Sequence, residues 1–196
     1  ALINYLVRLS WSHGDQEIFS REEMIALFDA VDVNTSASAF NTEKLHWLNQ
    51  HYIKNKKPAE LAELLQGFVH AHYYNTDIGP DLIEVLKVYR ERCTTLIELA
   101  EEIHFLYDDF DTYDTKQAKK QFKEATLPIL ESLKQQYEDL DDWTAEGIQQ
   151  VVENTVNTRE VGFGKVGQPL MVAVTGHGKS PSIEVTVGLL GKEKTL

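Results

Sequence analysis

The chain has 196 residues, of which 42% are hydrophobic and 26% charged, and its 19 Lys and Arg against 31 Asp and Glu give a formal net charge of −12. This composition excludes an intrinsically disordered chain and allows one or two globular domains. The negative charge argues against indiscriminate nucleic-acid binding and against DNA as a partner, but it is compatible with a local basic patch that binds a specific RNA.

Features of the termini and of cysteine usage indicate where the protein works. No stretch approaches the ~20 apolar residues of a membrane span, so we expect no membrane association. Residues 1–11 lack the pattern of a signal peptide and an initiating Met, and they are typical of the interior of a longer chain. The single cysteine, Cys93, excludes an internal disulfide and indicates a reducing compartment, which we take to be the cytoplasm.

Helical periodicity dominates the sequence, and strict alternation of apolar and polar residues is almost absent. A first helix is expected over residues 2–9, where Leu and Ile side chains share one side. Ser20 and Glu23 have the spacing of a capping box and predict a helix that runs to about Ala30. Residues 34–39 are small and polar, and we expect a loop there.

The next two helices are predicted from their ends. Asn41 can cap a helix that the lysine-rich residues 54–57 end. Pro58 suits the first turn of the helix that follows. Residues 75–80 combine Asn, Asp, Gly and Pro and predict a break in the chain.

The second half of the chain also reads as helix. Capping boxes at residues 95–98 and 114–117 predict helices that run to about Tyr107 and Ala125. A serine followed by proline at 180–181 predicts the start of the last helix. The remaining helices are expected over 81–92, 128–137, 143–157 and 166–174. The predicted fold is therefore all-α, with serial helical bundles and a boundary in the acidic, turn-rich stretch 108–114.

Two Glu-x-x-His pairs, Glu43 with His46 and Glu101 with His104, each place a carboxylate and an imidazole on one helical face, as a metal site requires. Such pairs are more often ordinary surface residues, and we expect no metal site. Residues 173–180 resemble a relaxed phosphate loop, but no strand–loop–helix pattern surrounds them, so we expect an interhelical loop. We expect no catalytic residue in the chain.

Three clusters of cations admit two interpretations. Either they are solvated charges that balance nearby acids, or they contact phosphates along an RNA backbone. The clusters are Lys54, Lys56 and Lys57; Lys87, Arg90 and Arg92; and Lys116, Lys119, Lys120 and Lys123.

Several ordered segments together resemble the C-terminal half of bacterial glutamyl-tRNA synthetases, which are class I aminoacyl-tRNA synthetases. The first 15 residues resemble the stretch that follows the family's second ATP-signature motif. Residues 40–49, FNTEKLHWLN, resemble its F-N-x-x-K-L-x-W-x-N segment. The further matching segments are 90–96, 143–146, 164–170 and 174–176.

The resemblance implies that the longer protein is a ligase that uses ATP and Mg²⁺ to charge tRNA(Glu) with glutamate for protein synthesis. The family's two ATP-signature motifs are absent from the 196 residues, so we expect a fragment that is inactive alone and holds no cofactor. It implies the end of a stem-contact domain over 1–56 and two anticodon-binding subdomains over 57–111 and 112–196. The expected partner is tRNA(Glu), bound by a monomer.

The resemblance also implies site residues. Arg90 or Arg92 would read the third anticodon base. Met171, Gly176, Ser180 and Ile183 would line a pocket for another anticodon base, and Lys44 and Trp47 would contact the tRNA stem. The family usually has Arg where this chain has Met171, and a thioether can pack or stack but cannot donate two hydrogen bonds to a base.

Two alternatives to a tRNA-binding fragment stay open at this point. The first is a stand-alone helical bundle that binds metal through the Glu-x-x-His pairs. The second is a protein-interaction module, which the net charge of −12 supports.

Overall fold

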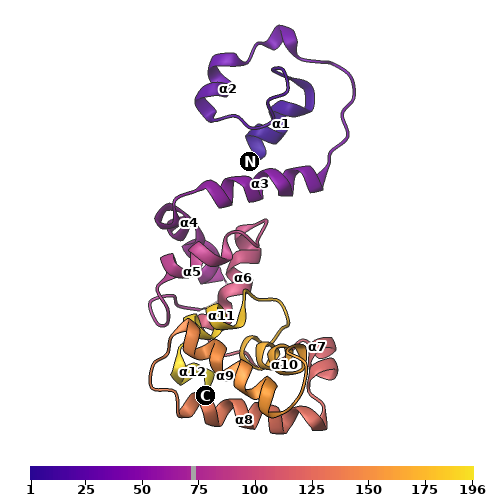
Figure 1. The fold of residues 1–196 in the computed structure, drawn as a ribbon. Helices are drawn as coiled ribbons and strands as arrows, with labels where there is room; N and C mark the ends of the chain where they lie inside the picture. The colour runs from indigo at the N-terminus through magenta and orange to yellow at the C-terminus, as the bar shows by residue number, and fades with distance from the viewer. Residues whose placement is uncertain (72–73) are drawn as a thin grey trace.

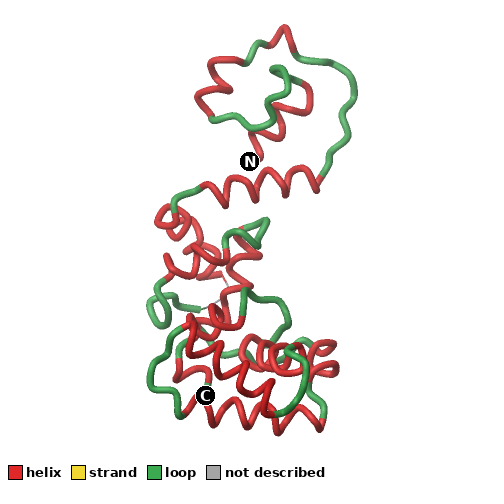
Figure 2. The backbone as a smooth tube through the Cα atoms, viewed as in Figure 1, coloured by secondary structure: helices red, strands yellow, loops and turns green. Residues whose placement is uncertain are grey.

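The computed structural model describes residues 1–71 and 74–196, and within them the all-α prediction is confirmed, because no strand occurs. Figure 2 shows this part of the chain as helices joined by loops. The α-helices are α1 (Leu2–Ser10), α2 (Arg21–Leu27), α3 (Thr42–Asn55), α4 (Pro58–Ala71), α5 (Leu82–Tyr89), α6 (Leu96–Tyr107), α7 (Thr115–Gln121), α8 (Leu127–Glu138), α9 (Ala145–Thr158), α10 (Gly164–Thr175), α11 (Ile183–Leu190) and α12 (Lys192–Thr195). Two short 3₁₀ helices cover Ala30–Asp32 and Glu124–Thr126.

The helices form an elongated molecule (Figure 1). Helices α1 and α2 lie at one end, above α3, which crosses the molecule. Helices α4 to α6 follow in the middle, and α7 to α12 gather at the other end, together with the C-terminus. The chain thus progresses along the long axis of the molecule from its N-terminus to the C-terminal bundle.

Three hydrophobic cores follow one another along this axis. The N-terminal core contains Trp11, Phe19 and Met24. The middle core is built mainly from α4, α5 and α6, and the C-terminal core mainly from α8, α9, α10 and α11. Helix α11 contributes to two of them, since Ile183 and Val187 are buried in the C-terminal core and Leu190 in the middle core. The predicted division at 56 and 111 stays a prediction.

Most predicted helix starts agree with the structure. Ser20 and Glu23 form a capping box in which each side chain accepts a backbone N–H of the other residue. Asn41 accepts the Lys44 backbone N–H at 3.0 Å, and Asp114 accepts that of Gln117 at 2.7 Å. These bonds satisfy amide groups that the first turn of a helix leaves without a partner.

The predicted capping boxes at 95–98 and 114–117 are only half present. At 95–98, the Thr95 hydroxyl accepts the Glu98 backbone N–H, but the Glu98 carboxylate accepts the N–H and the hydroxyl of Thr94. At 114–117, the Asp114 N–H donates to the Gly176 carbonyl and not to the Gln117 side chain.

The predicted start of the helix near residue 180, which is α11 in the structure, is wrong. The helix begins at Ile183, with Ser182 in the N-cap position. The Ser180 hydroxyl is hydrogen-bonded to the hydroxyl of Thr186 on α11, and so does not cap the helix. Several predicted helix ends also lie too far along the chain, because α2 ends at Leu27, α5 at Tyr89 and α7 at Gln121.

Asn4 holds the N-terminal segment together from inside. Its side chain is 1% exposed. Its amide nitrogen donates to the Glu17 carbonyl at 2.8 Å, and its oxygen accepts the Phe19 N–H at 2.7 Å. The Tyr52 hydroxyl of α3 lies 3.0 Å from the same oxygen. One buried amide therefore joins α1, the segment before α2, and α3.

We expect Asn4→Ala to lower the free energy of unfolding by about 2–4 kcal/mol, because the Glu17 carbonyl and the Phe19 N–H lose their buried partner. Urea denaturation followed by tryptophan fluorescence measures this, since Trp11 lies in the adjacent core. The control is Asn157→Ala at an exposed position of α9, which should change the value by about 0.5 kcal/mol or less. Equal midpoints for the two variants would contradict the role of Asn4.

Cys93 should be unreactive in the folded protein. Its side chain is 2% exposed, and burial raises the pKa of its thiol to about 12. The thiolate is the reactive form, and at pH 8 its fraction is about a thousandfold lower than for an ordinary cysteine. We expect an aromatic disulfide reagent to label Cys93 rapidly in urea and only slowly without it. Rapid stoichiometric labelling of the folded chain would contradict this assignment.

Candidate nucleic-acid interface

A pocket of about 240 Å³ lies between the start of α10 and the start of α11, and we call it the α10–α11 pocket. It brings together three of the residues predicted for a base pocket, Met171, Ser180 and Ile183. The full lining is Phe163, Gly164, Gly167, Gln168, Met171, Gly178, Ser180, Pro181, Ser182, Ile183 and Glu184. Met171 thus meets Ser180 and Ile183 because α10 and the loop before α11 fold back on each other.

The surfaces of this pocket suit a flat, partly polar group. Met171 and Ile183 are buried and provide apolar surface, and the Phe163 ring is 55% exposed. A Cβ on Gly167 would lie 2.6 Å from Ile183 Cδ1 and 3.1 Å from the Phe163 ring, so the missing Cβ lets these side chains lie close to α10. The exposed Gln168 adds a donor and an acceptor beside this apolar surface.

The loop after α10 is fixed by contacts with α6 and α7. Gly176 has a φ of +77° at the end of α10, and a Cβ there would lie 2.9 Å from the Phe110 ring. Its carbonyl accepts the Asp114 N–H at 2.8 Å. Gly176 therefore has a structural role. It lines a second pocket with Phe105, Phe110 and His177, apart from the α10–α11 pocket.

His177 stabilises the same loop as a neutral group. Its ring packs edge-on against Phe105 of α6, with 6.0 Å between ring centres. Burial lowers the pKa of His177, and the Lys179 backbone N–H donates to its Nδ1 at 3.3 Å. Both observations favour an uncharged imidazole that accepts at Nδ1.

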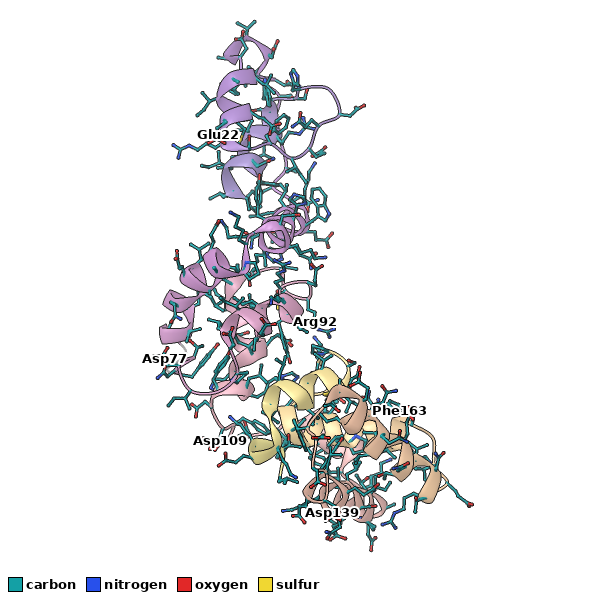
Figure 3. All side chains as sticks on the ribbon, turned by 60° about the vertical axis from the view of Figure 1, so that its left-hand side comes forward. Glu22, Asp77, Arg92, Asp109, Asp139 and Phe163 are labelled. Carbon is teal, nitrogen blue, oxygen red and sulfur yellow. The ribbon has the colours of Figure 1, made fainter. Side chains whose placement is uncertain are left out.

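The two arginines predicted as alternatives have different surroundings. Arg90 is half-buried, and its Nη1 donates to the Lys56 carbonyl at 2.9 Å, which ties the end of α5 to the α3–α4 connection. Arg92 is exposed, and its guanidinium makes no hydrogen bond or ion pair within residues 1–71 and 74–196. In Figure 3, Arg92 and Phe163 lie on one side of the molecule, and Asp77 and Asp109 lie on the other.

The two residues predicted to contact a tRNA stem both lie on α3. Lys44 Nζ lies 2.8 Å from Glu17 Oε2, and Arg8 binds the other oxygen of this carboxylate at 2.9 Å. The bonds from Arg8 and Lys44 lower the pKa of Glu17. Trp47 is 48% exposed and has its ring available for a partner. The assignment of both residues stays a prediction.

The three basic clusters differ in whether their lysines form ion pairs with acids. Lys54 pairs with Glu91 at 3.4 Å, Lys56 with Glu60 at 3.4 Å, and Lys87 with Glu84 at 2.5 Å. These pairs agree with the interpretation as balanced surface charges. The four lysines at and after α7 have no such acidic partner in the described part of the chain.

The described residues do not bring the Glu-x-x-His pairs together into a larger group of metal ligands. They contain no group of three His, Cys, Asp or Glu side chains that could hold a metal ion. Residues 173–180 continue from α10 into a loop, as expected, whereas a phosphate loop follows a strand. In this part of the chain, no helix is long and apolar enough to cross a membrane.

Sequence reasoning missed Phe163 and Gln168. Phe163 directly precedes the glycine-containing start of α10, and its neighbours along the chain are Gly162 and Gly164. An aromatic residue between two glycines is a weak sequence signal for an exposed ring. Its exposure and its position beside Met171 depend on how α10 packs against α11.

The chain is similar to known proteins in sequence and in structure. Residues 59–196 match the family model of the anticodon binding domain. The chain is similar in structure to a glutamate tRNA ligase from Elizabethkingia meningosepticum, solved in complex with its amino acid, with a TM-score of 0.84. It is also similar to a glutamate-tRNA synthetase from Elizabethkingia anophelis, with a TM-score of 0.77. Both are 25% identical to it, and each match covers 99% of this chain but only 38% of the other protein.

The two arginines should differ in their effect on stability. We expect Arg90→Gln to lower the free energy of unfolding by about 1–2 kcal/mol, because a hydrogen bond from a charged donor is lost. The matched variant Arg92→Gln should change it by about 0.5 kcal/mol or less, since Arg92 is exposed. Urea denaturation of both variants checks this, and equal losses would mean that Arg92 is also held by structural contacts.

Proposed function

We propose, on the premise that this chain belongs to the anticodon binding domain family, that it binds the anticodon loop of tRNA(Glu) as part of a glutamate–tRNA ligase. The observation that carries this proposal is the α10–α11 pocket, where Met171, Ser180 and Ile183 meet beside the exposed Phe163 ring. Anticodon bases are single-stranded, so they can be turned outward and held in pockets of this kind.

The pocket would hold one base by stacking and by hydrogen bonds to its edge. Phe163 offers an exposed ring face, and stacking on an aromatic side chain tolerates any base. Discrimination then comes from Gln168 and Glu184, which also line the pocket. Because a carboxylate accepts hydrogen bonds, Glu184 favours a base that presents an amino group.

Met171 changes the way in which this pocket selects a base. By the resemblance, the family usually has Arg at this position, and an Arg could donate two hydrogen bonds in one plane. Met171 is 6% exposed, and its thioether packs in the C-terminal core. Selection here would therefore depend on shape and on Gln168 and Glu184.

Arg92 would contact a second anticodon base. Its guanidinium is exposed and has no partner in residues 1–71 and 74–196, so it can donate two hydrogen bonds to one base edge. Arg90 is less suited, because its side chain already bonds the Lys56 carbonyl. The position of Arg92 and Phe163 on one side of the molecule supports contact with one RNA loop (Figure 3).

The ligase reaction belongs to the longer protein, because this chain spans only 38% of the length of the two similar ligases. That reaction would join glutamate to tRNA(Glu) with ATP and Mg²⁺. The role of the residues described here would be to position the tRNA. We infer that the chain is inactive in ligation on its own, and that the protein works in the cytoplasm as a monomer.

Titration of the chain with tRNA(Glu), and with the same tRNA carrying a changed anticodon, tests the proposal. We expect the correct anticodon to bind more tightly, by roughly tenfold or more, since one edge contact discriminates by about 1–3 kcal/mol. Phe163→Ala should weaken binding to tRNA(Glu) by about 1–3 kcal/mol, because stacking is lost. Arg92→Gln should reduce the preference at one anticodon position.

The control is Phe40→Ala, which removes another exposed aromatic ring in the N-terminal part and should leave the preference between the two tRNAs unchanged. Equal weak binding of both tRNAs by the unsubstituted chain would contradict anticodon reading by this chain alone. No binding at low salt would contradict the proposed function itself.

A further inference from the structure

Four exposed lysines lie on α7 and directly after it. Lys116, Lys119 and Lys120 lie on one side of α7 at i, i+3 and i+4, and Lys123 follows just after the end of the helix. All four are exposed. We call them the α7 lysine stripe.

The stripe differs from the other basic clusters because acids do not balance it. None of its lysines forms an ion pair within residues 1–71 and 74–196, whereas lysines of both other clusters do. The whole chain has a net charge of −12, so an unbalanced group of four positive charges is a local exception. Such a group attracts a polyanion, and no ion pair within the described residues has to break when the polyanion binds.

Helix α7 also contacts the wall of the α10–α11 pocket through Gln117. Helix α7 lies beside α10 (Figure 1). The Gln117 side chain lies so close to Gly178 that a Cβ on that glycine would be 3.1 Å from its Cδ. Gly178 lines the pocket, and the Asp114 N–H at the start of α7 bonds the Gly176 carbonyl. The stripe is therefore held at a fixed position next to the pocket.

We propose that the α7 lysine stripe binds the phosphate backbone of the RNA strand whose base occupies the α10–α11 pocket. This inference rests on the proposed function and adds a second contact to it. Lysine suits this role because its ammonium group is a point charge that needs no particular orientation toward a phosphate. Backbone contacts position an RNA without reading its sequence. The stripe thus adds affinity for any anticodon, and the pocket adds the preference for one.

The test compares two double variants with equal net charge. K116Q/K120Q removes two lysines of the stripe. K134Q/K194Q removes two lysines that pair with Glu138 at 3.9 Å and Asp109 at 3.5 Å, and Asp109 lies on the side of the molecule away from Phe163 (Figure 3). Binding of tRNA(Glu) and of its anticodon variant is measured at several salt concentrations, and circular dichroism checks that each variant is folded.

We expect K116Q/K120Q to weaken the binding of both tRNAs by the same factor. The ratio of their two affinities should therefore stay unchanged. The loss of affinity relative to the unsubstituted chain should be largest at low salt. The reason is that each lost phosphate contact makes the slope of log K against log salt less steep by about 0.7–0.9. For two lost contacts, the dissociation constant of K116Q/K120Q divided by that of the unsubstituted chain should fall about sevenfold or more between 50 and 200 mM salt. K134Q/K194Q should keep the original slope.

The outcomes separate the two proposals. Anticodon-dependent binding by the unsubstituted chain, with the same slope in K116Q/K120Q, would overturn the stripe and leave the proposed function standing. The same slope change in both double variants would also overturn it, because the effect would then come from net charge alone. No binding of tRNA by the unsubstituted chain would overturn both proposals.

Discussion

The burial of α11 in two cores is the constraint on which the candidate interface depends. Ile183 and Val187 pack in the C-terminal core, and Leu190, at the other end of the same short helix, packs in the middle core. Two contacts across the same junction support it, namely His177 against Phe105 and Gly176 against Phe110. Because packed apolar contacts of this kind resist displacement, Arg92 in the middle part keeps a defined position relative to the α10–α11 pocket.

The distribution of charge fits a binder that depends on a few contacts. In the other two clusters, Lys54, Lys56 and Lys87 are paired with acids. Acidic residues such as Asp77 and Asp109 lie on the side away from Arg92 and Phe163 (Figure 3). A chain with a net charge of −12 repels polyanions unless they meet the local positive surface. Such an arrangement gives up general affinity for nucleic acid in favour of selection among RNAs.

Met171 links the packing of the bundle to the proposed chemistry. It is buried in the C-terminal core and also lines the pocket, so its thioether contributes to stability and to the shape of the site. In the proposed function, a larger part of the selection passes to Gln168 and Glu184. The reason is that a side chain without donors can exclude a base by shape but cannot recognise its edge.

The sequence by itself determined the helices and most of their starts. Capping residues such as Ser20, Asn41 and Asp114 act within one turn, and their effect can be read from neighbouring residues. The sequence-based prediction was wrong at Ser180, because its hydroxyl bonds the Thr186 hydroxyl and does not cap the helix. Only the tertiary structure decided which arginine is exposed, that Phe163 lies beside Met171, and that the α7 lysines have no acidic partner in the described residues. These properties depend on contacts with side chains that are distant in sequence. A local pattern of residues therefore does not predict which distant side chains will cover or pair with it.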